Sequence, residues 1–258
     1  MAVQQRTQAE GLSSTSLADL ELRVESCRRC PRLVEWRERV AVEKRAAFRG
    51  EEYWGRPVGG FGDPAARVYV LGLAPAAHGA NRTGRVFTGD RSGDWLFASM
   101  HRTGYANQPE SLHRGDGLRL RDAFVAAAVR CAPPANKPLP SERENCLPYA
   151  LEELALMPQV RVILCLGGFA WDAALRVTGS VVRPRPRFGH LAEHGQESGR
   201  VLLGCYHPSQ QNTFTGRLTE EMTDAVFTRA RELAGSPSPS ASSRPCPSRR
   251  PPAPCPPS

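Results

Sequence analysis

Several features that mark other classes of protein are missing from this 258-residue chain. No apolar run reaches the roughly 18 residues that a membrane-spanning helix needs, so no contact with a membrane is expected. Residues 1–7 lack the apolar core of a secretory signal. Neither Gly-x-Gly-x-x-Gly nor Gly-Lys-Ser/Thr occurs, which disfavours the two common nucleotide-binding loops. We therefore expect a cytoplasmic protein that does not use either loop.

Acidic residues are also missing from residues 235–258, where three arginines contribute to a formal net charge of +8. The rest of the chain then carries +5, which fits a polyanionic partner such as nucleic acid but is shared by many enzymes with neutral substrates. The same segment is rich in Pro and Ser without apolar periodicity. We expect residues 1–16 and 235–258 to be disordered, on either side of one domain at residues 17–234.

Four apolar runs predict buried strands, at residues 68–71, 124–129, 160–166 and 201–206. Segments of helical periodicity alternate with these runs, at residues 17–24, 33–49, 94–103, 141–156, 168–175 and 219–233. Strands that alternate with helices predict an α/β sandwich around a largely parallel sheet.

The eight cysteines are many for a compartment that keeps thiols reduced, which favours metal or redox use for some of them. Cys27 and Cys30 form a C-x2-C pair, and Cys131 and Cys146 are the next two in the chain. Four thiolates could bind zinc or an iron–sulfur cluster, or they could be unrelated buried thiols. Most zinc ribbons contain a second C-x2-C pair, which is missing here, and fourteen residues separate Cys131 from Cys146. Both observations favour an iron–sulfur cluster over zinc. The remaining four are expected in core strands or in the tail: Cys165, Cys205, Cys246 and Cys255.

A glycine-rich loop, residues 72–95, follows the first predicted strand and contains five glycines. Such a loop lets the main chain approach a ligand closely. Asp90 lies in this loop, Asn136 in a proline-rich loop after the second strand, and His207 directly after the last strand. Asp90 could instead cap a helix, Asn136 shape a turn, and His207 serve as a structural histidine. Their shared position favours an active site, because the sites of open α/β sheets lie at the carboxyl ends of strands.

Several motifs, in one order, resemble family 5 (type B) uracil-DNA glycosylase over about residues 17–234. They are Gly-Leu-Ala-Pro-Ala-Ala-His-Gly at 72–79, Phe-Thr-Gly-Asp at 87–90, the C-x2-C pair, Cys-Ala-Pro-Pro-Ala-Asn-Lys-Pro at 131–138 and His-Pro-Ser-Gln-Gln-Asn at 207–212. Leu73 and Ala74 stand where wider relatives place an acidic or amide side chain that positions water. This apolar pair is typical of family 5.

The resemblance implies a three-layer α/β/α sandwich with a mainly parallel four-stranded central sheet. It implies that Cys27, Cys30, Cys131 and Cys146 hold a [4Fe-4S] cluster. It suggests that Asp90 or Asn136 orients the attacking water and that His207 donates to the departing base. The implied substrate-binding residues are Ala76, Ala77, His78, Gly79, Phe87, Ser209 and Asn212.

The implied activity is that of a monofunctional glycosylase that flips uracil out of double-stranded DNA and removes it by hydrolysis in base excision repair. Other deaminated bases, hypoxanthine and xanthine among them, are expected substrates. We expect a monomer associated with the nucleoid. Two alternatives remain, namely a non-catalytic iron–sulfur protein that binds DNA or transfers electrons, and a nucleotide-binding α/β enzyme.

Overall fold

Six strands form one mixed sheet in the order β1-β3-β2-β4-β6-β5 in the computed structural model, which describes residues 15–180 and 182–235. The four inner strands are mutually parallel: β3 (Ala123–Ala127), β2 (Val68–Gly72), β4 (Val162–Leu166) and β6 (Val201–Cys205). The edge strands β1 (Phe61–Gly62) and β5 (Glu193–Gly195) run antiparallel to their neighbours.

The predicted α/β class is confirmed, whereas the predicted number of four strands is wrong. All four predicted strands are present, and the two additional ones are the short edge strands. β1 comprises two residues in a glycine-rich segment, and β5 comprises three residues that are not buried. Such short, unburied segments carry no apolar pattern, so the sequence does not predict them. Each becomes a strand only because it pairs with the edge of the existing sheet. The predicted disorder at residues 1–16 and 235–258 lies outside the described residues except at residues 15, 16 and 235. For Ser16 it is wrong, because this residue is the N-cap of the helix at residues 17–25 and its Oγ accepts a hydrogen bond from the Asp19 N–H at 3.1 Å.

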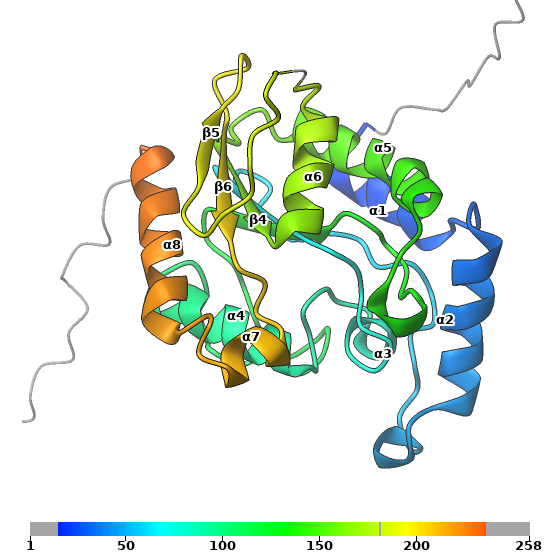
Figure 1. Ribbon diagram of the computed structural model, residues 1–258. Helices are drawn as coiled ribbons and strands as arrows, with labels where there is room; N and C mark the ends of the chain where they lie inside the picture. The colour runs from blue at the N-terminus through cyan, green and yellow to red at the C-terminus, as the bar shows by residue number, and fades with distance from the viewer. Residues whose placement is uncertain (1–14, 181, 236–258) are drawn as a thin grey trace, which may run out of the picture.

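Helices cover both faces of the sheet (Figure 1). α4 (Arg91–Arg102) and α8 (Glu220–Leu233) pack against one face, while α5 (Pro140–Leu156), α6 (Gly168–Val177) and α1 (Leu17–Glu25) lie on the other. The remaining helices are α2 (Pro31–Glu43), α3 (Ala80–Thr83) and α7 (Gln210–Phe214), with 3-10 turns at Ala46–Phe48 and Pro134–Asn136. None of the helices within residues 15–180 and 182–235 is both long and apolar enough to cross a bilayer.

The core follows from the alternation of side chains along the strands. Val70 of β2 belongs to the cluster that contains Phe97 of α4, whereas the next residue, Leu71, belongs to the cluster that contains Trp171 of α6. Every residue of β2, β3 and β4 is buried, as expected for parallel strands that are covered on both faces.

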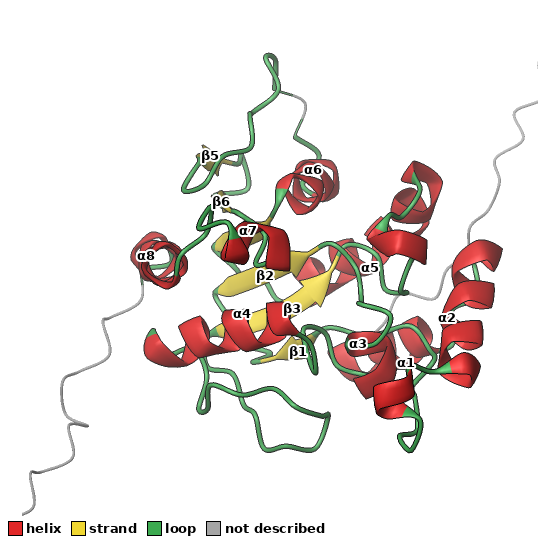
Figure 2. Ribbon diagram, turned by 60° about the horizontal axis from the view of Figure 1, so that its bottom comes forward, coloured by secondary structure: helices red, strands yellow, loops and turns green. Residues whose placement is uncertain are grey.

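The strand register brings the carboxyl ends of the inner strands to one edge. Gly72 pairs with Ala127, and Leu166 pairs with Cys205. The loops that follow β2, β3 and β6 therefore emerge together. They gather with α3, α4 and α7 at the end of the sheet that comes forward in Figure 2.

Candidate active site

A cavity of about 580 Å³ lies at this end of the sheet, between the loops that follow β2, β3 and β6. We call it the base pocket. Its lining residues are Leu73, Ala74, Ala76, Val86, Phe87, Asp90, Arg91, Ser92, Asn136, His207, Ser209, Gln210 and Gln211. The three predicted catalytic residues thus come together from segments that are far apart in the sequence.

Asp90 is the N-cap of α4 and also lines the base pocket. The backbone N–H of Gly93 donates to its Oδ1 at 3.0 Å. Its Oδ2 packs against Gly79, where an added Cβ would lie only 2.1 Å from that oxygen. Burial raises the pKa of Asp90, although the backbone N–H groups of Gly93 and Ser92 oppose the shift. The Asp90 carboxylate therefore caps α4 and lines the base pocket at the same time, so the two roles considered for it do not exclude each other.

Phe87 forms an aromatic wall of the base pocket. Its backbone has a left-handed φ of 52°, which is rare for a bulky residue. Its ring lies directly over Gly72, where an added Cβ would be 2.7 Å from ring atoms. The ring centroids of Phe87 and His207 are 6.1 Å apart. A glycine at position 72 therefore makes room for the aromatic side chain.

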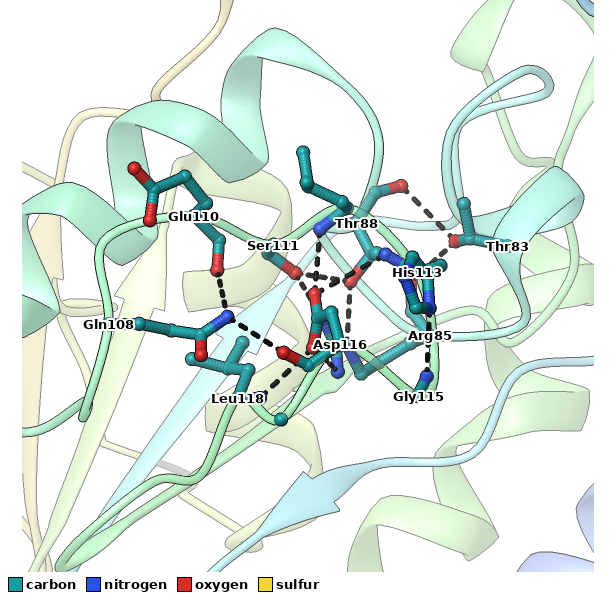
Figure 3. A network of polar contacts seen from close by, with 12 residues as sticks. Thr83, Arg85, Thr88, Gln108, Glu110, Ser111, His113, Gly115, Asp116 and Leu118 are labelled. Carbon is teal, nitrogen blue, oxygen red and sulfur yellow. Dashed lines mark hydrogen bonds and ion pairs between the residues drawn. The ribbon is translucent and has the colours of Figure 1, made fainter.

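A buried polar network holds the segment that carries Phe87 (Figure 3). Arg85 pairs with Asp116 through two contacts of 2.9 and 2.6 Å. The same guanidinium donates to Thr88 Oγ1 at 3.0 Å and to Ser111 Oγ at 2.8 Å. These bonds hold Arg85 and Thr88, which lie on either side of Phe87 in the chain, and they explain how its strained backbone persists.

His207 is half-buried, and burial lowers its pKa to about 4. The imidazole is therefore neutral near pH 7. Its carbonyl accepts a bond from Asn212 Nδ2 at 2.9 Å, and Ser209 Oγ accepts one from the Asn212 N–H at 3.4 Å. Asn212 thus shapes the loop from within, whereas Ser209 lines the pocket. Asn136 has a left-handed φ of 55° and reaches the pocket from an exposed turn.

The pocket includes some of the predicted substrate-binding residues and not others. Ala76, Phe87 and Ser209 line it, whereas Ala77, His78, Gly79 and Asn212 do not. His78 Nδ1 instead lies 3.1 Å from the hydroxyl of Tyr53.

Sequence reasoning missed Val86, Arg91 and Ser92 as lining residues. It placed Gln210 and Gln211 in a segment that could fill the gap left by a flipped base, but not in the pocket. The predicted helix begins at residue 94, whereas α4 begins at Arg91, directly after Asp90. An earlier predicted start would have placed Arg91 and Ser92 in the first turn of the helix, next to Asp90.

Four free cysteines meet at a second, closed location, which we call the cysteine site. Cys27, Cys30, Cys131 and Cys146 line one small cavity between the start of α2, the end of β3 and α5. Arg37 Nη1 donates to Cys131 Sγ at 2.9 Å, and Asn145 Nδ2 donates to Cys30 Sγ at 3.4 Å. In the described part of the chain, no three His, Cys, Asp or Glu side chains are grouped as a metal-ion site. The predicted cluster stays a prediction.

The family model of the uracil DNA glycosylase superfamily matches residues 60–231. A type-5 uracil-DNA glycosylase of Mycobacterium tuberculosis is 55% identical over 85% of this chain and 82% of its own length. The Thermus thermophilus protein of the same name is 54% identical over 81% and 94%, respectively. The chain belongs to the type-5 uracil-DNA glycosylases. This confirms the family that the motifs resemble.

A type-4 uracil-DNA glycosylase of Pyrobaculum aerophilum is more distant, at 30% identity over 61% of this chain and 74% of its own length. For a type-5 uracil-DNA glycosylase, the apolar pair Leu73 and Ala74 is of particular interest, because both residues line the base pocket. These two side chains therefore form an apolar wall of the base pocket directly after β2.

Proposed function

We propose that this type-5 uracil-DNA glycosylase, a hydrolase of N-glycosyl bonds, removes uracil from double-stranded DNA and also accepts hypoxanthine and xanthine. We place the reaction in base excision repair. The observation that carries the proposal is the meeting of Asp90, Asn136 and His207 in one cavity with an aromatic wall.

A base in a duplex must leave the stack before its glycosidic bond can be attacked. Phe87 offers a face for the extruded base, and Leu73 and Ala74 add apolar surface. A cavity of about 580 Å³ lies within the usual range of small-molecule pockets, so its size does not exclude a purine such as hypoxanthine.

Cleavage leaves negative charge on the departing base. A neutral His207 can donate an N–H to that charge, and its low pKa keeps it in this form near pH 7. A donor held in place before the reaction stabilises the transition state without the cost of reorganising solvent. We assign this role to His207.

The sugar becomes cation-like as the base departs. An ionised Asp90 would stabilise that charge and orient the attacking water, and Asn136 is the second candidate for orienting the water. Among the described residues that line the cavity there is no lysine, so water is the proposed nucleophile. This supports a monofunctional glycosylase that leaves the DNA strand intact.

We also propose that the cysteine site holds a [4Fe-4S] cluster. Four free thiols that face one closed cavity, with N–H donors aimed at two of the sulfurs, match the needs of thiolate ligands. Such a cluster would cross-link the segment at the start of α2, the loop after β3 and α5. We assign it no part in base release.

The test is a single-turnover assay of base release from matched duplexes that carry uracil, hypoxanthine or xanthine at one position. The parent protein should release all three, and His207→Ala should release them far more slowly. His101→Ala is the matched control, because His101 is exposed at the end of α4 and does not line the pocket. Binding to the duplexes without release of any base would contradict the proposal and favour a non-catalytic DNA-binding protein.

A further inference from the structure

Three arginine side chains in the described part of the chain are buried, namely Arg37, Arg85 and Arg130. Two of them have a buried carboxylate as partner. Arg85 pairs with Asp116 (Figure 3), and Arg130 pairs with Glu153 through contacts of 2.8 and 2.7 Å. This is expected, because an uncompensated charge is costly to bury.

Arg37 differs from the other two. It is 2% exposed, and its Nη1 donates to Cys131 Sγ at 2.9 Å. Both Nη atoms also donate to the Cys27 carbonyl at 3.2 Å. Among the described residues, the only carboxylate within 4 Å of its guanidinium is that of Glu38, which is 3.7 Å away, 44% exposed and bonded to Arg28.

The positive charge of Arg37 is therefore buried without a buried carboxylate to balance it. Its guanidinium points to the cysteine site, so an anion at that site would balance the charge. Its Nε has no hydrogen-bond partner among the described residues. Four thiolates around an iron–sulfur cluster form a net anion, which would supply the missing negative charge.

We propose that Arg37 is the charge partner of the cluster and raises its reduction potential. The inference rests on the proposed cluster at the cysteine site. Arg37 donates to the Cys131 thiolate and balances the negative charge of the cluster. Reduction adds a further negative charge, so a nearby cation favours the reduced form. Hydrogen bonds to cluster sulfurs and local charge are established determinants of such potentials.

Asn145 provides an internal comparison. Its Nδ2 donates to Cys30 Sγ at 3.4 Å, but it is neutral and exposed. Its replacement should change the cluster less than the replacement of Arg37.

The experiment compares Arg37→Gln, Arg37→Lys and Arg39→Gln, all purified without oxygen from iron-replete cells. Arg39 is the matched control, because it lies on the same helix and is 46% exposed. Iron content, release of iron to a chelator and the reduction potential are measured. We expect Arg37→Gln to lose iron roughly tenfold faster or more, because partners of metal ligands typically contribute 10–100-fold to affinity. Its potential should be lower, whereas Arg37→Lys and Arg39→Gln should stay near the parent.

The outcomes separate the two proposals. A parent protein without iron would overturn the cluster and this inference together. An iron-loaded parent beside a folded Arg37→Gln with parental potential and parental iron release would overturn the inference alone. If Arg37→Gln does not fold, Arg37→Lys decides, since it keeps the charge. A folded lysine variant with a lowered potential would show that charge at this position does not set the potential.

Discussion

The base pocket and the cysteine site are neighbours built in opposite ways. The base pocket has a volume of about 580 Å³, whereas the cavity at the cysteine site has one of about 10 Å³. The loop after β3 contributes one residue to each site. Cys131 belongs to the cysteine site, and Asn136, five residues later, lines the base pocket. Ala74 packs against the hydrophobic cluster that contains Cys30, Cys131 and Cys146, and it also lines the base pocket.

The difference indicates how each site would acquire its proposed ligand. An open cavity can exchange its ligand with solvent, as an enzyme that turns over DNA requires. A closed cavity that is lined by thiols and backed by a buried arginine suits a group that is enclosed as the chain folds. The two sites should therefore respond to different substitutions.

The largest expected effect is at the cysteine site. We expect the parent protein to contain iron and to be brown, as iron–sulfur proteins are, and Cys27→Ala or Cys146→Ala should abolish both properties because each removes a proposed ligand. Cys165→Ala is the control, since this buried thiol lies within β4 and outside the cysteine site. Metal analysis that finds stoichiometric zinc and no iron would refute the cluster.

At the base pocket, Asp90→Ala should slow uracil release on the order of 10²- to 10⁴-fold, the usual range for a group that acts in proton transfer. Single-turnover rates would measure this, with DNA affinity determined separately. If Asp90→Ala keeps the parental rate while Asn136→Ala is inactive, then Asp90 is only a helix cap and Asn136 orients the attacking water.

The pH dependence sharpens the role of Asp90. Burial raises the pKa of this carboxyl, and the proposed role needs its ionised form. The rate should therefore fall on the acid side, starting above the usual range of an aspartate. Asp90→Asn should lack that acid limb. If the rate of Asp90→Asn falls at the same acidic pH as that of the parent, the group that ionises there is not Asp90.

A smaller effect is expected from the contact between Gly79 and Asp90. Gly79→Ala would place a methyl group 2.1 Å from Asp90 Oδ2, so the carboxylate must shift. We expect the rate to fall roughly 10²-fold, which is typical of a displacement of about 1 Å. Gly115→Ala is the matched control, because its added carbon would lie 3.8 Å from the nearest atom, His113 Nδ1. Equal rates for the two variants would show that the position of Asp90 is not critical.

The smallest effect should come from removing residues 235–258. This Pro/Ser-rich segment has no apolar periodicity, so neither the base pocket nor the cysteine site should depend on it. The melting temperature and uracil release of the truncated protein should equal those of the full chain. A large drop in melting temperature would show that the segment packs on the domain.

The inner strands were predictable because complete burial in a parallel sheet leaves continuous apolar runs. The gathering of Asp90, Asn136 and His207 was predictable from their positions after those strands. The four-residue helix α3 and the five-residue helix α7 were not, because such short helices carry no periodic signal.

The role that we propose for Arg37 was not predicted from the sequence either. It occupies the apolar stripe of α2 between Leu33 and Val40, where a charge is unexpected. That position was the available signal, but only the packing shows that its guanidinium faces Cys131.

The most direct test of the active-site assignment compares His207→Ala with the parent enzyme on a uracil duplex. Single-turnover release and equilibrium affinity are measured in the same buffer near pH 7. If His207 acts on charge that appears as the bond breaks, the rate falls roughly 10²- to 10³-fold while affinity changes little. A parental rate, or a loss that lies entirely in affinity, would contradict the account.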